Sequence, residues 1–311
     1  YNTLFTLIGG LAILIVPFLF DLGLGIFRVF ILIMGALAAV FHLILSYGVK
    51  ERKQLHEKDE FKGINFAKEI KETFKNRSFV SFLVFNFSVV FLTTLSLNYA
   101  PLLGFIFRLD GLDTIILLTF YGGYIIALPF YYVLIRKIEM RTLILSISIL
   151  IGFVILLLFI IDLIFKLTIV YLINFIIIGI FMALTIFYYP FISDTIDFDE
   201  LSTNRRREGI HFGMNALITK PAEQLPAIIG GIILILANYQ EGEPALAQPE
   251  TAIWGLKILV TIIPMIFAIL GIISQLINPL KGVKLIKMKE EILVMHEEKE
   301  KNQGINKNQT S

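Results

Sequence analysis

The sequence predicts an all-α integral membrane protein, and three observations lead to this fold class. Of the 311 residues, 57% are hydrophobic and 17% are charged, whereas roughly a quarter of the residues in a soluble domain are charged. The charged residues are clustered, and the apolar runs between the clusters reach the length of about 20 residues that crosses a bilayer core. These runs are too long and too uniformly apolar for barrel strands. Each is therefore expected to form a helix that satisfies its own backbone hydrogen bonds in lipid.

About eight membrane spans are expected in chain order. They cover residues 4–20, 27–47, 79–100, 114–135, 143–161, 167–191, 212–237 and 252–277. The chain opens with Tyr1 inside an apolar run and lacks the basic region of a signal peptide. We therefore expect these residues to belong to a longer chain.

Lysine and arginine are concentrated in alternate loops. Residues 49–77 are rich in both, and the later basic positions are Arg136, Lys137, Arg141, Arg205, Arg206, Arg207, Lys281, Lys284, Lys287 and Lys289. The loops between them are poor in basic residues, and residues 238–251 contain none. Because basic loops stay on the cytoplasmic side of a membrane, this alternation predicts that the basic loops and the C-terminus are cytoplasmic.

The longest polar segment inside the chain is residues 49–77. Within it, Phe66, Ile70 and Phe74 recur at helical i, i+4 spacing beside lysines. This spacing is typical of a short amphipathic helix on the membrane surface or against the cytoplasmic ends of other helices. An ordinary basic linker is an equally open alternative.

Several classes of function are disfavoured by residues that the chain lacks. There is no cysteine, so disulfides and thiolate chemistry are excluded, and the four histidines show no metal-ligand spacing. No phosphate-binding loop is present. The net charge of +2 does not indicate a nucleic-acid partner. We therefore expect no enzyme activity, no metal and no organic cofactor.

The seventh span carries the most unusual polar pattern. His211, Asn215, Thr219 and Glu223 repeat every four residues, and Lys220 lies beside them. Ionisable side chains inside a membrane are costly, so this stripe is expected to face a water-filled cavity or polar groups of other helices. The alternative is a polar seam that joins helices. Tyr121 and Tyr124 of the fourth span are candidates for stacking on a sugar ring, or they are packing residues.

The most specific segment is residues 193–221, SDTIDFDELSTNRRREGIHFGMNALITKP. It resembles the signature of the glycoside–pentoside–hexuronide:cation symporters, the melibiose-permease-like branch of the major facilitator superfamily. Asp194, Asp197 and Glu200 occupy the acidic positions of that motif, Arg206, Arg207, Glu208 and Gly209 the basic run, and Lys220 the lysine of the following helix. Phe198, Asp199 and Pro221 depart from the motif, which suggests a divergent subgroup.

The resemblance implies a fold and a domain organisation. The eight spans would correspond to helices five to twelve of a major facilitator bundle. Residues 1–48 would be the last two helices of the N-terminal bundle, and residues 49–77 the central cytoplasmic loop. Residues 78–280 would form the C-terminal six-helix bundle, and residues 281–311 a cytoplasmic tail. The protein would then be a multi-pass protein of the cell membrane.

The resemblance also implies a function, namely cation-coupled symport of a sugar or glycoside by alternating access, with Na⁺ or H⁺ as the coupling ion. Lys220 would sense the state of the cation site, and Glu223 would lie beside it. Asn215, Thr219 and Thr185 would line the cavity. The cytoplasmic gate would comprise Asp194, Asp197, Glu200, Arg206, Arg207 and Glu208. Two alternatives remain open, transport of a lysolipid or organic acid on the same scaffold, and a membrane scaffold or sensor that transports nothing.

Overall fold

The computed structural model describes residue 19 and residues 22–48, 66–106, 113–165, 169–243 and 247–309. Within these ranges the regular structure is entirely helical. The contacts divide the chain into two units, one made of residues 1–62 with 293–311 and the other of residues 63–292. In the first unit, α2 (Leu24–Gly48) contains the predicted span 27–47, whereas the predicted span 4–20 lies outside the described residues.

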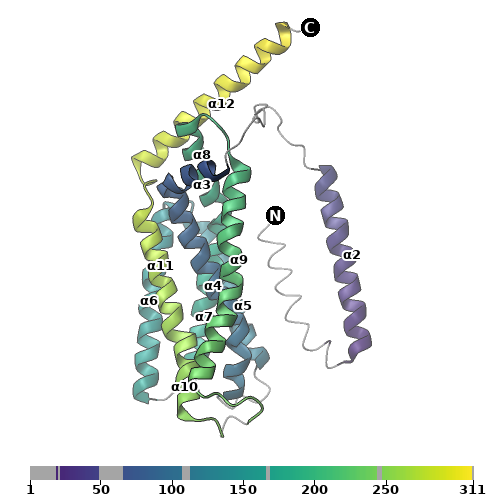
Figure 1. Ribbon diagram of the computed structural model, residues 1–311, viewed down its shortest axis with the longest axis vertical. Coiled ribbons are helices and arrows are strands. Elements are labelled where there is room, and N and C mark those ends of the chain that lie inside the picture. The colour runs from purple at the N-terminus through teal and green to yellow at the C-terminus, as the bar shows by residue number, and fades with distance from the viewer. Residues whose placement is uncertain are drawn as a thin grey trace. The chain divides into compact units, whose positions relative to one another are not determined.

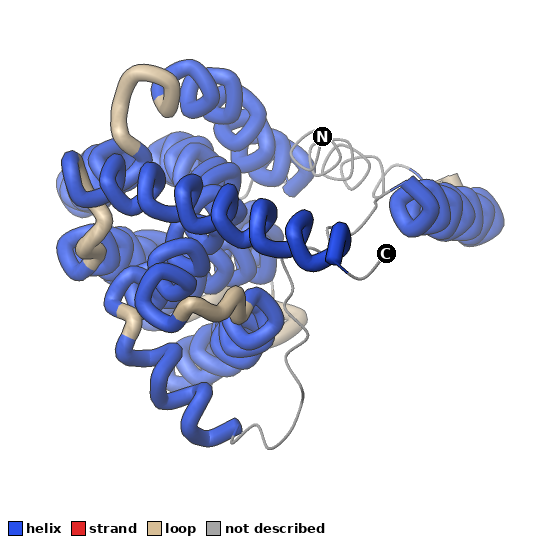
Figure 2. The backbone as a smooth tube through the Cα atoms, turned by 90° about the horizontal axis from the view of Figure 1, so that it is seen from above, coloured by secondary structure: helices blue, strands red, loops and turns tan. Residues whose placement is uncertain are grey.

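The second unit is a helical bundle (Figures 1 and 2). Its elements are α3 (Phe66–Lys75), α4 (Arg77–Ile106), α5 (Asp113–Leu134), α6 (Met140–Phe165), α7 (Ile169–Met182), the 3₁₀ turn η1 (Ala183–Phe187), α8 (Tyr188–Thr203), α9 (Glu208–Leu236), α10 (Glu250–Lys257), the π turn η2 (Ile258–Ile262), α11 (Ile263–Ile277) and the beginning of α12 (Val283–Gln309). The turns η1 and η2 join their neighbours, so that Ile169–Thr203 and Glu250–Ile277 are continuous helices.

The described residues contain 7 helices that are long and apolar enough to cross a membrane. They coincide with the predicted spans from 27–47 onward, so the prediction of an all-α membrane bundle is confirmed. One boundary differs by more than a few residues. The span predicted to end at residue 191 continues as a helix to Thr203. Its second half is charged and extends beyond the apolar segment, but its backbone remains helical. Asn204 then ends α8 with a left-handed backbone, φ 54°.

Helix α4 forms the centre of the bundle and contacts α9, α11, α5, α7 and α8. Its large side chains Phe82, Phe85 and Phe91 are fully buried. Helices α5 and α7 pack most closely, at a pair of glycines. A methyl group at Gly123 would overlap the Ile176 carbonyl, and one at Gly179 the Phe120 carbonyl. Small residues at such a crossing allow two backbones to approach and increase the dispersion contact that holds membrane helices together.

The described basic segments of the second unit contact one another at one end of the bundle, the upper end in Figure 1. Arg207 of the α8–α9 loop pairs with Glu69 of α3, and Lys289 of α12 pairs with Asp194 of α8. Gly282, before α12, donates its N–H to Glu139 of the α5–α6 loop at 3.2 Å. This is the arrangement that the alternation of basic loops predicts. The assignment of this end to the cytoplasm stays a prediction.

Candidate functional site

The polar stripe of α9 does not lie on one face of the bundle. His211, Asn215 and Thr219 are buried, whereas the side chains of Lys220 and Glu223 are 71% and 38% exposed. Each step of four residues advances by roughly 40° around an α-helix, because one turn contains 3.6 residues. The line of polar residues therefore rotates away from the bundle interior along α9, and the charged side chains of Lys220 and Glu223 lie on the outer side of the helix.

The buried part of the stripe is a hydrogen-bonded seam between α4, α8 and α9. Asn86 donates to the Asn215 side-chain oxygen at 2.8 Å, and Asn215 donates to the Tyr188 hydroxyl at 3.1 Å. Thr219 donates its hydroxyl proton to the Asn215 carbonyl at 2.9 Å. These contacts match the polar seam that the sequence left open as an alternative. A role for Asn215 and Thr219 in lining a cavity stays a prediction.

Lys220 and Glu223 form an ion pair near the middle of α9. The ammonium nitrogen lies 2.8 and 3.0 Å from the two carboxylate oxygens of Glu223. Both side chains project from the bundle rather than into it. A charged pair at this height of a membrane helix costs several kcal/mol in contact with lipid. The pair therefore requires a polar surface or an aqueous cavity on the outer side of α9.

The candidate aromatic residues and Thr185 lie where α5 meets η1. Tyr121 and Tyr124 are buried, with exposed fractions of 5% and 3%. Tyr124 lies beside Thr185, and the Tyr121 ring contacts Phe120 edge-on at 5.3 Å. In this structure the tyrosines fill the bundle interior, so stacking on a sugar stays a prediction.

Arg206 is the first centre of the charge cluster between α8 and α9. Its guanidinium lies 3.0 Å from Asp197, 2.8 Å from Glu200 and 2.5 Å from Glu208. The left-handed Asn204 turns the chain back over the end of α8, which brings this arginine to carboxylates earlier in the sequence. The structure thus brings together four of the six predicted gate residues.

Arg207 is the second centre, and its partners in this structure lie outside the predicted gate residues. It forms two hydrogen bonds with Asp199, at 2.9 and 2.6 Å, and a third with Glu69 of α3 at 2.7 Å. Arg205 approaches Glu69 as well, at 3.4 Å. From the sequence, Asp199 was identified only as a departure from the family motif. Asp194 joins neither arginine and pairs with Lys289 at 3.3 Å.

Helix α3 contacts the bundle through its polar side. Glu69 and Thr73 are buried, whereas Phe74 is 42% exposed. The hydrogen bond from Arg207 lowers the pKa of Glu69 below its ordinary value of 4.5, against the opposing effect of burial. This interaction therefore contributes its full stabilisation above about pH 4.5 and loses it as the pH falls through the lower, folded pKa. At neutral pH, α3 stays attached to Arg207.

A second buried ion pair lies at the opposite end of the bundle. The Lys257 ammonium is 2.6 Å from Asp162, and the Tyr171 hydroxyl donates to the same carboxylate oxygen at 2.7 Å. Lys257 lies near the beginning of the predicted span 252–277, where a lysine can extend to the membrane surface, but here its side chain is 14% exposed and paired with Asp162. Asp162 was overlooked because it lies one residue beyond the predicted span 143–161. Pairing removes the cost of leaving either charge alone inside the protein.

No group of three or more histidine or acidic residues in the described ranges is arranged to hold a metal ion. The expectation that the protein needs neither a metal nor an organic cofactor stays a prediction.

Comparison with known proteins gives two findings. Residues 1–281 match the family described as MFS/sugar transport protein. An uncharacterized symporter of Synechocystis sp. is 32% identical over 92 residues, which cover 29% of this chain and 17% of the symporter. The matched segment is thus a small part of that relative.

Proposed function

The chain belongs to the family of MFS/sugar transport proteins, and we therefore propose that it forms part of a cation-coupled symporter for a sugar or glycoside. It is a multi-pass membrane protein of a family of transporters rather than of enzymes. The similarity to an uncharacterized symporter supports the coupling of solute movement to an ion.

The exposed ion pair of Lys220 and Glu223 is the observation that carries this proposal. Its position near the middle of an apolar helix requires a polar counterpart outside the bundle of residues 63–292. In a transporter of two bundles, the substrate and ion sites lie at the bilayer midplane between the bundles. Residues 78–280 would be the second bundle, residues 1–48 would belong to the first, and α9 would line the central cavity.

Lys220 would act as a movable positive charge in this cavity. With a cation bound nearby, electrostatic repulsion would keep the ammonium on Glu223. After the cation leaves, the Lys220 ammonium would turn toward the acidic groups that had bound the cation. Such an exchange makes the charge of the cavity depend on the bound ion, which is the requirement for coupling ion and solute movement.

The charge cluster would connect this cavity to the cytoplasmic end. Arg206 holds α8 to the beginning of α9, and Arg207 holds both to α3. Helix α3 precedes residues 78–280, the proposed second bundle, in the chain. Rocking of the first bundle would pull on this segment. The cluster would then keep the inner end closed in one conformation and open when α3 is displaced.

A flux measurement tests the proposal. The intact transporter in lipid vesicles is expected to accumulate a labelled sugar or glycoside when a Na⁺ or H⁺ gradient is imposed, and to stop when the gradient is dissipated. Vesicles without protein provide the control. Accumulation of a lysolipid or an organic acid instead would replace the proposed substrate class, and solute binding without flux under either gradient would contradict transport.

The proposed orientation predicts which loops are reached from outside the cell. In this cysteine-free chain, cysteine introduced at Glu241 is expected to react with an impermeant maleimide in intact cells, and cysteine at Lys137 only after the membrane is opened. Both positions are exposed, so accessibility within the protein is matched. Labelling of the Lys137 position from outside would reverse the proposed orientation.

A further inference from the structure

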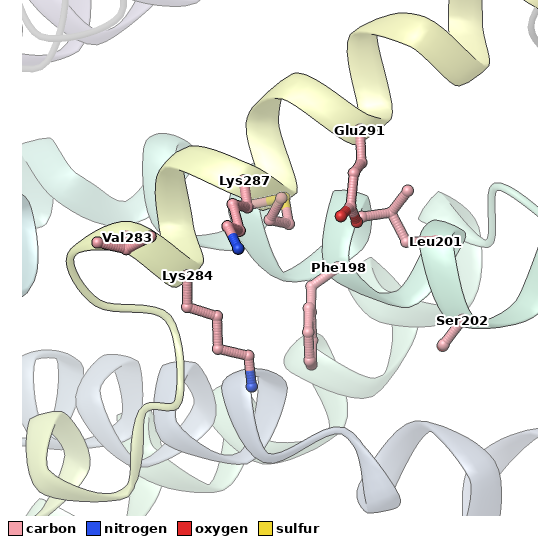
Figure 3. Close-up of a pocket in the computed structure, with 8 residues that line it drawn as sticks. Phe198, Leu201, Ser202, Val283, Lys284, Lys287 and Glu291 are labelled. Atoms are coloured by element: carbon pink, nitrogen blue, oxygen red, sulfur yellow. The ribbon is translucent and has the colours of Figure 1, made fainter.

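A hollow of about 490 Å³ lies between the end of α8 and the beginning of α12 (Figure 3). Phe198, Leu201 and Met288 give it apolar walls, and Lys284 and Lys287 extend into it from α12. It lies at the basic end of the bundle, where Lys289 pairs with Asp194. None of its residues belongs to the cavity proposed for transport.

The lysines of this hollow are available to a ligand. Among the described residues, neither Lys284 nor Lys287 has a carboxylate within ion-pair distance, in contrast to Lys289 at 3.3 Å from Asp194. The Lys284 ammonium lies 5.2 Å from the centre of the Phe198 ring, which holds it inside the hollow without neutralising it. Glu291 also lines the hollow, but its single negative charge is smaller than the combined positive charge of the two lysines.

The hollow lies at the expected boundary between membrane and water. Its α8 residues are in the last turns of the spanning helix Ile169–Thr203, and α12 begins shortly after the spanning helix ends at Ile277. Val283 and Ile286 on α12 are 68% and 58% exposed beside the lysines. Exposed apolar side chains next to lysines are typical of a helix at the headgroup level of a bilayer, where the apolar groups contact acyl chains.

We propose that this hollow binds the headgroup of an anionic phospholipid. Lys284 and Lys287 would contact its phosphate, and Val283 and Ile286 would contact the beginning of its acyl chains. Lysines immediately beyond the last membrane helix are typical of anionic lipid recognition. A soluble phosphate would satisfy the lysines but leave the apolar groups uncovered. A bound lipid would brace α12 against α8, beside the ion pair of Lys289 and Asp194.

Binding of phosphatidylglycerol to the purified full chain tests this site, with phosphatidylcholine as the uncharged comparison lipid. Native mass spectrometry is expected to show preferential retention of one phosphatidylglycerol. A single lysine near an anionic surface contributes about fivefold to affinity, so the double variant Lys284→Gln and Lys287→Gln is expected to bind roughly 30-fold more weakly. The matched control is Lys71→Gln with Lys137→Gln, which removes equal charge from exposed positions at the same end and should leave the affinity unchanged.

Three outcomes would overturn the proposal. Equal affinity of the double variant and the parent would remove the lysines from the site, and an equal loss in the control variant would show a nonspecific effect of charge. Displacement of the lipid by millimolar inorganic phosphate would assign the site to a soluble anion. The result does not depend on transport, so it is independent of the proposed symport activity.

Discussion

Replacement of Lys220 by methionine together with Glu223 by glutamine is expected to abolish cation-driven accumulation while the protein remains folded. The cation gradient can drive solute only if ion occupancy changes the charge balance of the cavity. Without the Lys220 ammonium this dependence is lost. Coupling free energies of about 1–3 kcal/mol correspond to a change of roughly 5- to 150-fold in the affinity for one ligand when the other binds. After a loss of this size, accumulation with and without the gradient should become equal.

Folding is expected to survive because the double replacement removes both members of an exposed pair and leaves neither charge alone. The matched control is Lys257→Met with Asp162→Asn, which neutralises a second lysine–carboxylate pair within the described membrane helices. This control should retain coupling even where it lowers the melting temperature. Uptake in vesicles and thermal unfolding in detergent measure the two effects separately. Gradient-driven accumulation in the Lys220 and Glu223 double variant would remove Lys220 from the mechanism.

Replacement of Arg207 by alanine is expected to destabilise the bundle by about 3–5 kcal/mol, the usual cost of removing one partner from a buried ion pair. The side chains of Arg207 and Asp199 are 3% and 4% exposed, so the Asp199 carboxylate would be left buried and uncompensated. Glu69 would lose its closest cationic partner as well. Thermal unfolding of the purified protein measures this loss.

Arg205→Ala is the matched control, because Arg205 lies in the same loop but its side chain is 41% exposed and 3.4 Å from Glu69. A loss of about 1 kcal/mol or less is expected there. The variant Arg207→Met with Asp199→Asn should recover part of the stability, because it also removes the Asp199 carboxylate that would otherwise be left buried without its arginine. If the cluster acts as a gate, this stabilised variant should still bind solute but show impaired flux. Unchanged flux would contradict the gate.

The charge cluster shows how far sequence reasoning extends at a site. Asp197, Glu200, Arg206 and Glu208 lie within a few residues of one another, so a local motif was sufficient to group them. Glu69 and Arg207 are 138 residues apart, and no local pattern links them. The same holds for Asp162 and Lys257, which are 95 residues apart and meet only because α6 packs against the continuous helix Glu250–Ile277.

By itself, the sequence determined the all-α membrane fold, the order of the spans and the alternation of basic loops. These properties follow from local composition, because a bilayer requires an apolar helix of nearly fixed length and places lysine and arginine at one side. Only the tertiary structure decided how the polar residues of α9 divide. Asn215 is buried because α4 and α8 present Asn86 and Tyr188 to it, and Lys220 is exposed because no helix of residues 63–292 covers that face. Burial depends on neighbouring helices that are distant in the chain, so helical periodicity alone could not separate the two groups.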